Sequence, residues 1–129
     1  MDLEDRIAIT ELISLHGHLV DAGDPPDRLF TPDVRYDVSD LGGGVLIGPE
    51  AVWQAGLALG EGNPVGHHVT NVVLTEVGPD EVASLSKGIG VMADGSCGSA
   101  TYEDTVVRTP AGWRISRRKV IRRRRPLGR

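Results

Sequence analysis

Two strand-forming segments joined by a tight turn dominate the last third of the sequence and constrain its fold more than any other feature. The segment from Tyr102 to Arg108 reaches the turn Thr109-Pro110-Ala111-Gly112, which leads into Trp113-Arg114-Ile115. Proline and glycine in a short connection between such segments are typical of a β-hairpin. Comparable patterns upstream complete a predicted four-stranded antiparallel meander, with strands near residues 66–77, 82–93, 98–108 and 113–122.

The first half of the chain has the spacing and the capping residues of helices. Apolar side chains recur every three or four positions over residues 3–20, which predicts an amphipathic helix. The sequence Asp24-Pro25-Pro26-Asp27 predicts the start of a short second helix over residues 28–30. A third helix should begin at Pro49 and end at Gly60, because proline favours the first helical position and glycine the end.

A second hairpin is expected between the second and third helices. Thr31-Pro32-Asp33 should end the second helix, after which residues 34–38 alternate between apolar and polar side chains. Their predicted partner is the apolar segment 45–47, across the turn Gly42-Gly43-Gly44. Three helices, a hairpin and a meander define an α+β fold, in which the helices pack on one face of a strongly curved antiparallel sheet around a central pocket.

Composition places this fold in a single domain. A chain of 129 residues is the size of one compact domain, here expected over residues 1–122 and followed by a basic tail at 123–129. No apolar run approaches the roughly 20 residues that span a bilayer, and the acidic N-terminus lacks a secretion signal, so a cytoplasmic location and no membrane association are expected. Cys97 is the only cysteine, which excludes an intramolecular disulfide and agrees with a reducing compartment.

Charge is distributed unevenly along the chain. The first 107 residues hold all 18 acidic residues and 4 of the 14 basic ones, whereas the other 10 basic residues follow Val107. The run Arg122–Arg125 is the kind of segment that can bind nucleic acid. However, aromatic residues that could stack on bases are missing from the run, and the acidic body would repel phosphate. The favoured interpretation is a solvated strand end that pairs with acidic groups of its own fold or of a partner subunit, so nucleic acid is not expected as a partner.

Five short fragments, in order along the chain, resemble one known family. They are Asp21-Ala22-Gly23-Asp24, Leu29–Val34, Gly48-Pro49-Glu50-Ala51, His67–Asn71 and Gly112-Trp113-Arg114-Ile115. Their order and spacing are similar to those of the SnoaL-like branch of the nuclear transport factor 2-like superfamily, and the resemblance covers nearly the whole chain. It implies a cone-shaped fold with one deep pocket, acid/base chemistry in that pocket, and pairing of two copies into a homodimer.

The resemblance selects one histidine as the proton carrier. His67 and His68 are adjacent on a predicted strand, so their side chains point to opposite faces and only one can enter the pocket. Aligning Asn71 with the His-x-x-x-Asn pattern of scytalone dehydratase-like members implies that His67 is catalytic. Imidazole suits proton transfer because its pKa lies near neutral pH. The alternative is that His67 is a structural histidine between sheet and helix.

A second candidate pair lies at the end of the first helix. In dehydratase-like members this place holds a Tyr-x-x-x-x-Asp pair, and here His16 stands where tyrosine is expected, with Asp21 five residues later. The resemblance implies that Asp21 orients His67 or acts as an acid, and that His16 replaces the phenol as a donor. The alternative is that Asp21 only caps the following loop.

The last candidate donors lie on predicted strands. Asp104 aligns with the oxyanion donor of steroid isomerase-like members, and Tyr102 shares its strand face; the alternative for Asp104 is an ion pair with Arg108 or Arg114. Tyr36 is a further possible donor, on the same face as Val34 and Val38. The general base of isomerase-like members would fall near Val38, where no acid stands because Asp37 lies on the other strand face, and this disfavours a steroid isomerase mechanism. Residues expected to contact the ligand are Trp53, Leu57, His68, Ile89, Val91 and Met92.

These residues support two main hypotheses of function. The first is a cofactor-independent acid/base enzyme of the dehydratase, cyclase or isomerase kind, acting on a small, largely apolar carbonyl or polyketide-like compound. The second is a non-catalytic module that binds a small molecule or assembles as a dimer. No clustered metal-ligand spacing and no phosphate or dinucleotide motif occurs, so neither a metal nor a cofactor is expected.

Overall fold

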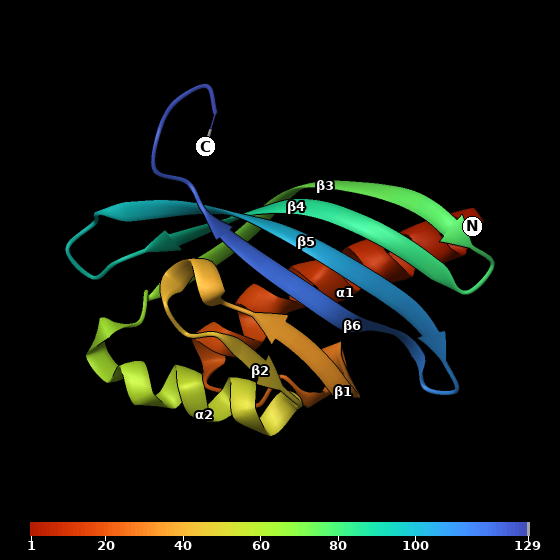
Figure 1. Ribbon diagram of the computed structural model, residues 1–129, viewed down its shortest axis with the longest axis horizontal. Helices are drawn as coiled ribbons and strands as arrows, with labels where there is room; N and C mark the ends of the chain where they lie inside the picture. Colours follow the sequence, from red (N-terminus) through yellow and green to blue (C-terminus); the bar gives the residue numbers. More distant parts are fainter. Residues whose placement is uncertain (129) are drawn as a thin grey trace.

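The computed structural model describes residues 1–128 and shows an α+β fold (Figure 1). Arg129, the last residue of the predicted tail 123–129, lies outside the described residues. The elements are helices α1 (Leu3–Ala22) and α2 (Pro49–Leu59), and strands β1 (Phe30–Asp37), β2 (Val45–Ile47), β3 (Gly66–Gly78), β4 (Glu81–Val91), β5 (Cys97–Thr109) and β6 (Gly112–Arg122). Single turns of 3-10 helix cover Asp27–Leu29, Ser39–Leu41 and Gly60–Gly62.

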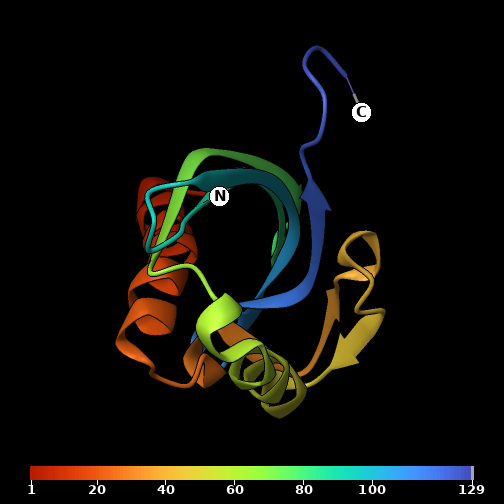
Figure 2. The same cartoon turned by 90° about the vertical axis from the view of Figure 1, so that its left-hand side faces the viewer.

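The strands form one curved sheet in the order β2-β1-β6-β5-β4-β3. Strands β3 to β6 pair as the predicted antiparallel meander, and β1 pairs with β2 as the predicted hairpin. β1 also pairs with β6 in the parallel direction, so the sheet is mixed, and the prediction of a wholly antiparallel sheet is wrong. The sheet curls around α1 and α2 without closing on itself (Figure 2).

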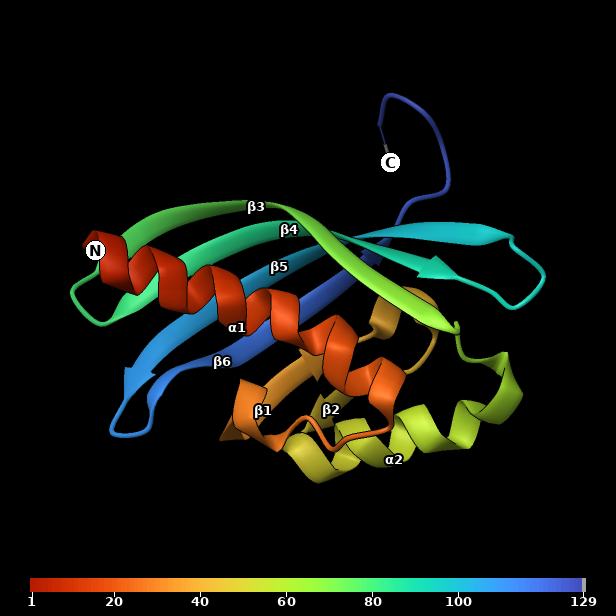
Figure 3. The same ribbon diagram turned by 180° about the vertical axis from the view of Figure 1, so that it is seen from behind.

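Helix α1 packs across the concave side of the sheet, next to β3 (Figure 3). Asp2 and Asp5 begin the helix with a reciprocal capping box, and Gly23 ends it in the left-handed conformation, with φ 70°. The apolar stripe of α1 faces β4, β5 and β6, and the buried core formed there includes Ile9, Leu12, Ile13, Leu19, Val82, Val106 and Ile115. Burial of such side chains stabilises the fold by about 1.5–3 kcal/mol each.

The prediction of a helix over residues 28–30 is wrong, and the structure has two α-helices within residues 1–128 instead of three. Only the 3-10 turn Asp27–Leu29 forms, because the chain already pairs with β6 at Phe30. Pro32 lies inside β1, where the register with β6 shifts between Phe30 and Arg35. Proline has no N–H for a sheet ladder and is tolerated at such an irregularity. In the same described range, no helix has the length and apolar composition needed to cross a bilayer.

Strand β3 changes the face that it presents to α1 partway along its length. His67 and Val69 are partly buried, and beyond Asn71 the partly buried residues become Val72 and Leu74. Asn71 has a φ of 58°, and the register with β4 shifts between Thr70 and Val73. Such a bulge inserts an extra residue and reverses the alternation. It therefore lets His67 and the apolar end of β3 face the same helix.

Candidate active site

The last turn of α1 and the start of β3 bring Asp21 and His67 into direct contact. The Asp21 Oδ1 atom lies 2.7 Å from His67 Nδ1, and both carboxylate oxygens accept from the His67 main-chain N–H at 3.1 Å. Partial burial raises the pKa of Asp21, but the ring and main-chain hydrogen bonds from His67 outweigh it and hold this pKa below its ordinary value of 3.8. Because an ionised carboxylate only accepts, Nδ1 carries the proton and Nε2 is left free to act as a base.

His16 lies between this pair and Tyr102. Its ring centroid is 6.1 Å from that of His67 and 5.9 Å from that of Tyr102, both in edge-to-face arrangements. The side chain is buried, and its Nδ1 atom has no hydrogen-bond partner. Burial, together with the charges of Arg118 and His67, holds the pKa of His16 well below its ordinary value of 6.5. His16 is therefore an uncharged polar group in the interior.

Asp104 is buried against Arg118, a residue that the sequence patterns did not single out. Arg118 Nε donates to Asp104 Oδ1 at 2.7 Å and Nη2 donates to Oδ2 at 2.9 Å, and neither side chain is exposed. The partner of Asp104 is thus neither Arg108 nor Arg114. Arg108 instead pairs with Asp5 and Asp80. Since both Asp104 oxygens accept hydrogen bonds, this carboxylate is placed as an acceptor, whereas Arg118 Nη1 has no partner.

Both tyrosines that were candidate donors lie beside Arg118. The Arg118 guanidinium stacks over the Tyr102 ring at 4.4 Å. Burial raises the pKa of Tyr102 to about 12, although the Arg118 charge opposes this. Burial likewise raises the pKa of Tyr36, whose ring packs edge-to-face on Phe30 at 5.8 Å. Both phenols therefore keep their protons at neutral pH and remain hydrogen-bond donors.

Gly88 makes room for the Tyr102 ring on the inner face of the sheet. A Cβ atom at Gly88 would lie 2.6 Å from the Tyr102 hydroxyl oxygen, closer than real side chains approach. Ser84 and Ser86, on the same strand and buried on the same face, have hydroxyls without a partner. Buried polar atoms without partners are uncommon in proteins, so this inner face carries unused hydrogen-bonding capacity next to the candidate residues.

A cavity of about 300 Å³ opens between the end of α1 and helix α2. Its walls are mostly apolar and include Val20, Phe30, Val52, Trp53, Leu57 and Pro64. Trp53 and Leu57, two of the six expected ligand contacts, line this cavity. Of the six candidate catalytic residues, His16 alone lines the cavity, and the ring centroid of His67 lies 6.1 Å from that of His16.

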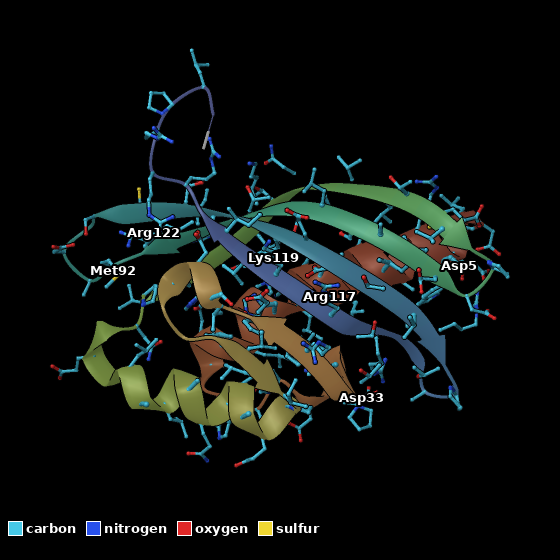
Figure 4. The ribbon with its side chains drawn as sticks, viewed as in Figure 1. Asp5, Asp33, Met92, Arg117, Lys119 and Arg122 are labelled. Atoms are coloured by element: carbon cyan, nitrogen blue, oxygen red, sulfur yellow. The ribbon has the colours of Figure 1, made fainter. Side chains whose placement is uncertain are left out.

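The other four expected ligand contacts lie outside this cavity. His68 is exposed, and it pairs across the sheet with Ile89. Ile89 and Val91 alternate with Gly88 and Gly90, so they occupy the opposite sheet face from Tyr102. Met92 follows β4 at the hairpin that leads to β5, far from Asp5 at the other end of the molecule (Figure 4). In residues 1–128, no three histidine, cysteine or acidic side chains converge in an arrangement that could bind a metal ion.

The structure thus combines a curved sheet wrapped around a helix with a histidine–aspartate pair at the end of that helix. The model of the SnoaL-like domain matches residues 1–119, and the chain belongs to this family, in the nuclear transport factor 2-like superfamily. An uncharacterized protein of Mycobacterium tuberculosis (strain ATCC 25618 / H37Rv) is 32% identical over 127 residues, covering 91% of this chain and 84% of its relative.

Solved structures agree with this family membership. An NTF2-like protein with a cystatin-like fold from Novosphingobium aromaticivorans is 31% identical, with a TM-score of 0.77 and coverage of 93% of this chain and 82% of that one. The hexachlorocyclohexane dehydrochlorinase LinA-type3 from Novosphingobium barchaimii LL02 has a TM-score of 0.79 at 22% identity, with coverage of 95% and 88%. The second likeness concerns the fold alone.

Proposed function

We propose that this protein is a cofactor-independent acid/base enzyme of the dehydratase, cyclase or isomerase kind, acting on a small, largely apolar carbonyl compound. The observation that carries the proposal is the contact of Asp21 with His67 Nδ1 at 2.7 Å. A carboxylate in this position fixes the ring tautomer and stabilises the imidazolium that forms when Nε2 accepts a proton. The neutral His16 ring and the mostly apolar cavity beside it favour an uncharged ligand.

The proposed reaction begins with removal of a proton from the carbon next to the carbonyl group. His67 Nε2 takes this proton, the electron pair of the C–H bond becomes the double bond of an enolate, and the carbonyl oxygen becomes negatively charged. The hydroxyls of Tyr102 and Tyr36 donate hydrogen bonds to that oxygen, and the Arg118 guanidinium supplies positive charge nearby. Asp104 holds Arg118 in place, and His16 donates one hydrogen bond to the ligand.

The second step decides the kind of product. If the compound carries a C=C bond next to the carbon that lost the proton, the enolate is a dienolate, and return of the proton from His67 to its far carbon gives a double-bond isomer. If the proton goes to a hydroxyl group one carbon further along, that group leaves as water and the result is an unsaturated carbonyl compound. In both cases His67 gives up the proton that it took and is again a base, so the reaction needs no cofactor.

Exchange of carbon-bound hydrogen tests this proposal without knowledge of the natural substrate. Small cyclic ketones are incubated with the protein in D₂O, and the loss of the proton next to the carbonyl is followed by NMR. We expect exchange above the buffer rate, and a decrease of about 10²- to 10⁴-fold in His67→Ala. His68→Ala is the matched control, since this neighbouring histidine is exposed. No exchange by the wild type, or equal exchange by His67→Ala, would reject the proposal.

A non-catalytic binding module is the second candidate, and the cavity favours it. The cavity wall contains His16 but not His67, so a ligand confined to this space would not touch the base. This candidate predicts that an apolar ketone quenches the fluorescence of Trp53 on the cavity wall, whereas no ketone exchanges its protons.

The dimer implied by the family would use the outer face of the sheet. Val73 and Leu85 are 59% and 49% exposed there. On the neighbouring strands, Glu103 pairs with Leu85, and Lys119 pairs with Glu103. Lys119 and Arg117 both lie on β6 (Figure 4). Opposite charges beside an apolar patch suit pairing with a second copy. Sedimentation of the wild type and of Leu85→Glu tests this, with a dimer expected only for the wild type.

A further inference from the structure

Gly17 lies where α1 crosses β3, directly over the main chain of His67. A Cβ atom at this position would overlap the His67 carbonyl oxygen, and it would lie 3.2 Å from the carbonyl carbon and 3.7 Å from the His67 Cβ atom. These are mainly backbone atoms of a paired strand, so they cannot rotate away as the end of a flexible side chain could. The missing side chain of Gly17 therefore permits the close approach of α1 to His67.

Gly17 and Asp21 are one helical turn apart, so they lie on the same face of α1. Both touch the same residue of β3: Gly17 approaches the carbonyl group of His67, and Asp21 accepts from its main-chain N–H and contacts its ring. Gly17 is buried, as the crossing point requires. The distance between helix and strand at Gly17 consequently sets how far the Asp21 carboxylate must reach.

The reach of Asp21 leaves little tolerance. One short side chain serves three contacts at once, at 3.1, 3.1 and 2.7 Å. Hydrogen bonds of this type weaken rapidly beyond about 3.2 Å. A helix displaced by several tenths of an ångström would therefore lose either the ring contact or the main-chain contact.

We propose that Gly17 is a positioning residue, which sets the spacing between α1 and β3 so that Asp21 holds the ring of His67. This inference rests on the proposed function for its catalytic meaning, but the spacing itself is measurable in the resting protein. Gly17→Ala should displace the helix even though alanine is the better helix former, so helix propensity alone would change stability in the opposite direction.

The experiment compares Gly17→Ala, Asp21→Glu and the double variant by NMR. The readouts are the downfield His67 Nδ1–H resonance and the hydrogen-exchange rate of the His67 main-chain amide. In Gly17→Ala we expect the resonance to disappear and the amide to exchange at least about tenfold faster, because its acceptor has moved. Glutamate is one methylene longer than aspartate, so the double variant should recover both signals. Gly56→Ala is the control, since a Cβ atom at this helical glycine meets nothing within 4 Å.

The NMR signals of His67 show whether Gly17 sets the spacing between α1 and β3. Loss of both signals in Gly17→Ala and their recovery in the double variant support the proposal. An unchanged His67 spectrum in Gly17→Ala overturns it, and so does loss without recovery in a folded double variant, because spacing would then not be what Gly17 controls. If ketone exchange exists, Gly17→Ala should lower its rate about 100-fold. If the wild type exchanges no ketone but the NMR pattern appears, the proposed function fails and the role of Gly17 stands.

Discussion

Asp104 and Arg118 form an ion pair with two hydrogen bonds, of 2.7 and 2.9 Å, in which neither side chain is exposed. The two residues face each other across β5 and β6. The pair supports the ring of Tyr102, over which the guanidinium stacks. It therefore connects the packing of the sheet to the proposed donor groups.

Removing one member of this pair should destabilise the protein strongly. Arg118→Met leaves the Asp104 carboxylate buried without a counter-ion, which costs about 3–5 kcal/mol. Urea denaturation measures the loss. Arg117→Met, at the exposed neighbouring position, is the control and should stay within about 0.5 kcal/mol of the wild type. Adding Asp104→Leu to Arg118→Met should restore much of the lost free energy of unfolding. If Arg118→Met loses no more stability than Arg117→Met, and Asp104→Leu restores nothing, the pair is not buried in solution.

His16 should make stability depend on pH below neutrality. Its pKa is well below 6.5 in the folded protein, whereas the unfolded chain binds a proton near 6.5. Stability should therefore be complete above pH 6.5 and decrease as the pH falls below it, with a slope that approaches about 1.4 kcal/mol per pH unit. Denaturation between pH 7 and 5 should show this slope in the wild type and in His18→Gln, an exposed site, but not in His16→Gln. An equal slope in all three proteins would contradict the burial of His16.

The bulge in β3 should accept glycine but not a branched side chain at Asn71. Glycine adopts the observed φ of 58° readily, so Asn71→Gly should change the free energy of unfolding little. Valine is strained in this conformation, and Asn71→Val should cost at least about 1–2 kcal/mol. Thermal unfolding of both variants checks the difference. A fully stable Asn71→Val would mean that β3 can continue without the bulge.

Local sequence patterns predicted most of the fold. Helix α1, the β1–β2 hairpin and the meander follow from periodicity and turn residues, which act over short distances. The parallel pairing of β1 with β6 joins segments about 80 residues apart in sequence, so no local pattern reveals it. For the same reason, the strand that contains Pro32 was predicted to begin too late.

The candidate site was only partly predictable. The resemblance led to His67 and Asp21, which the structure brings together at 2.7 Å. Arg118 was missed because it stands between Arg117 and Lys119 in a run that looks solvated. One signal was available: Arg118 lies two residues before buried Val120 and so shares its strand face. The cavity wall also contains Gly23, Pro26 and other loop residues, whose arrangement depends on tertiary packing.

Ketone hydrogen exchange by Asp21→Asn tests the proposed role of the Asp21–His67 pair most directly. The asparagine amide can donate a hydrogen bond to His67 Nδ1, which would move the ring proton to Nε2 and remove the base while preserving the shape of the pair. We expect a rate at least about 100-fold below that of the wild type, close to that of His67→Ala, with the fold intact by circular dichroism. An Asp21→Asn protein that exchanges ketone protons at the wild-type rate would contradict the claim that this pair carries the chemistry.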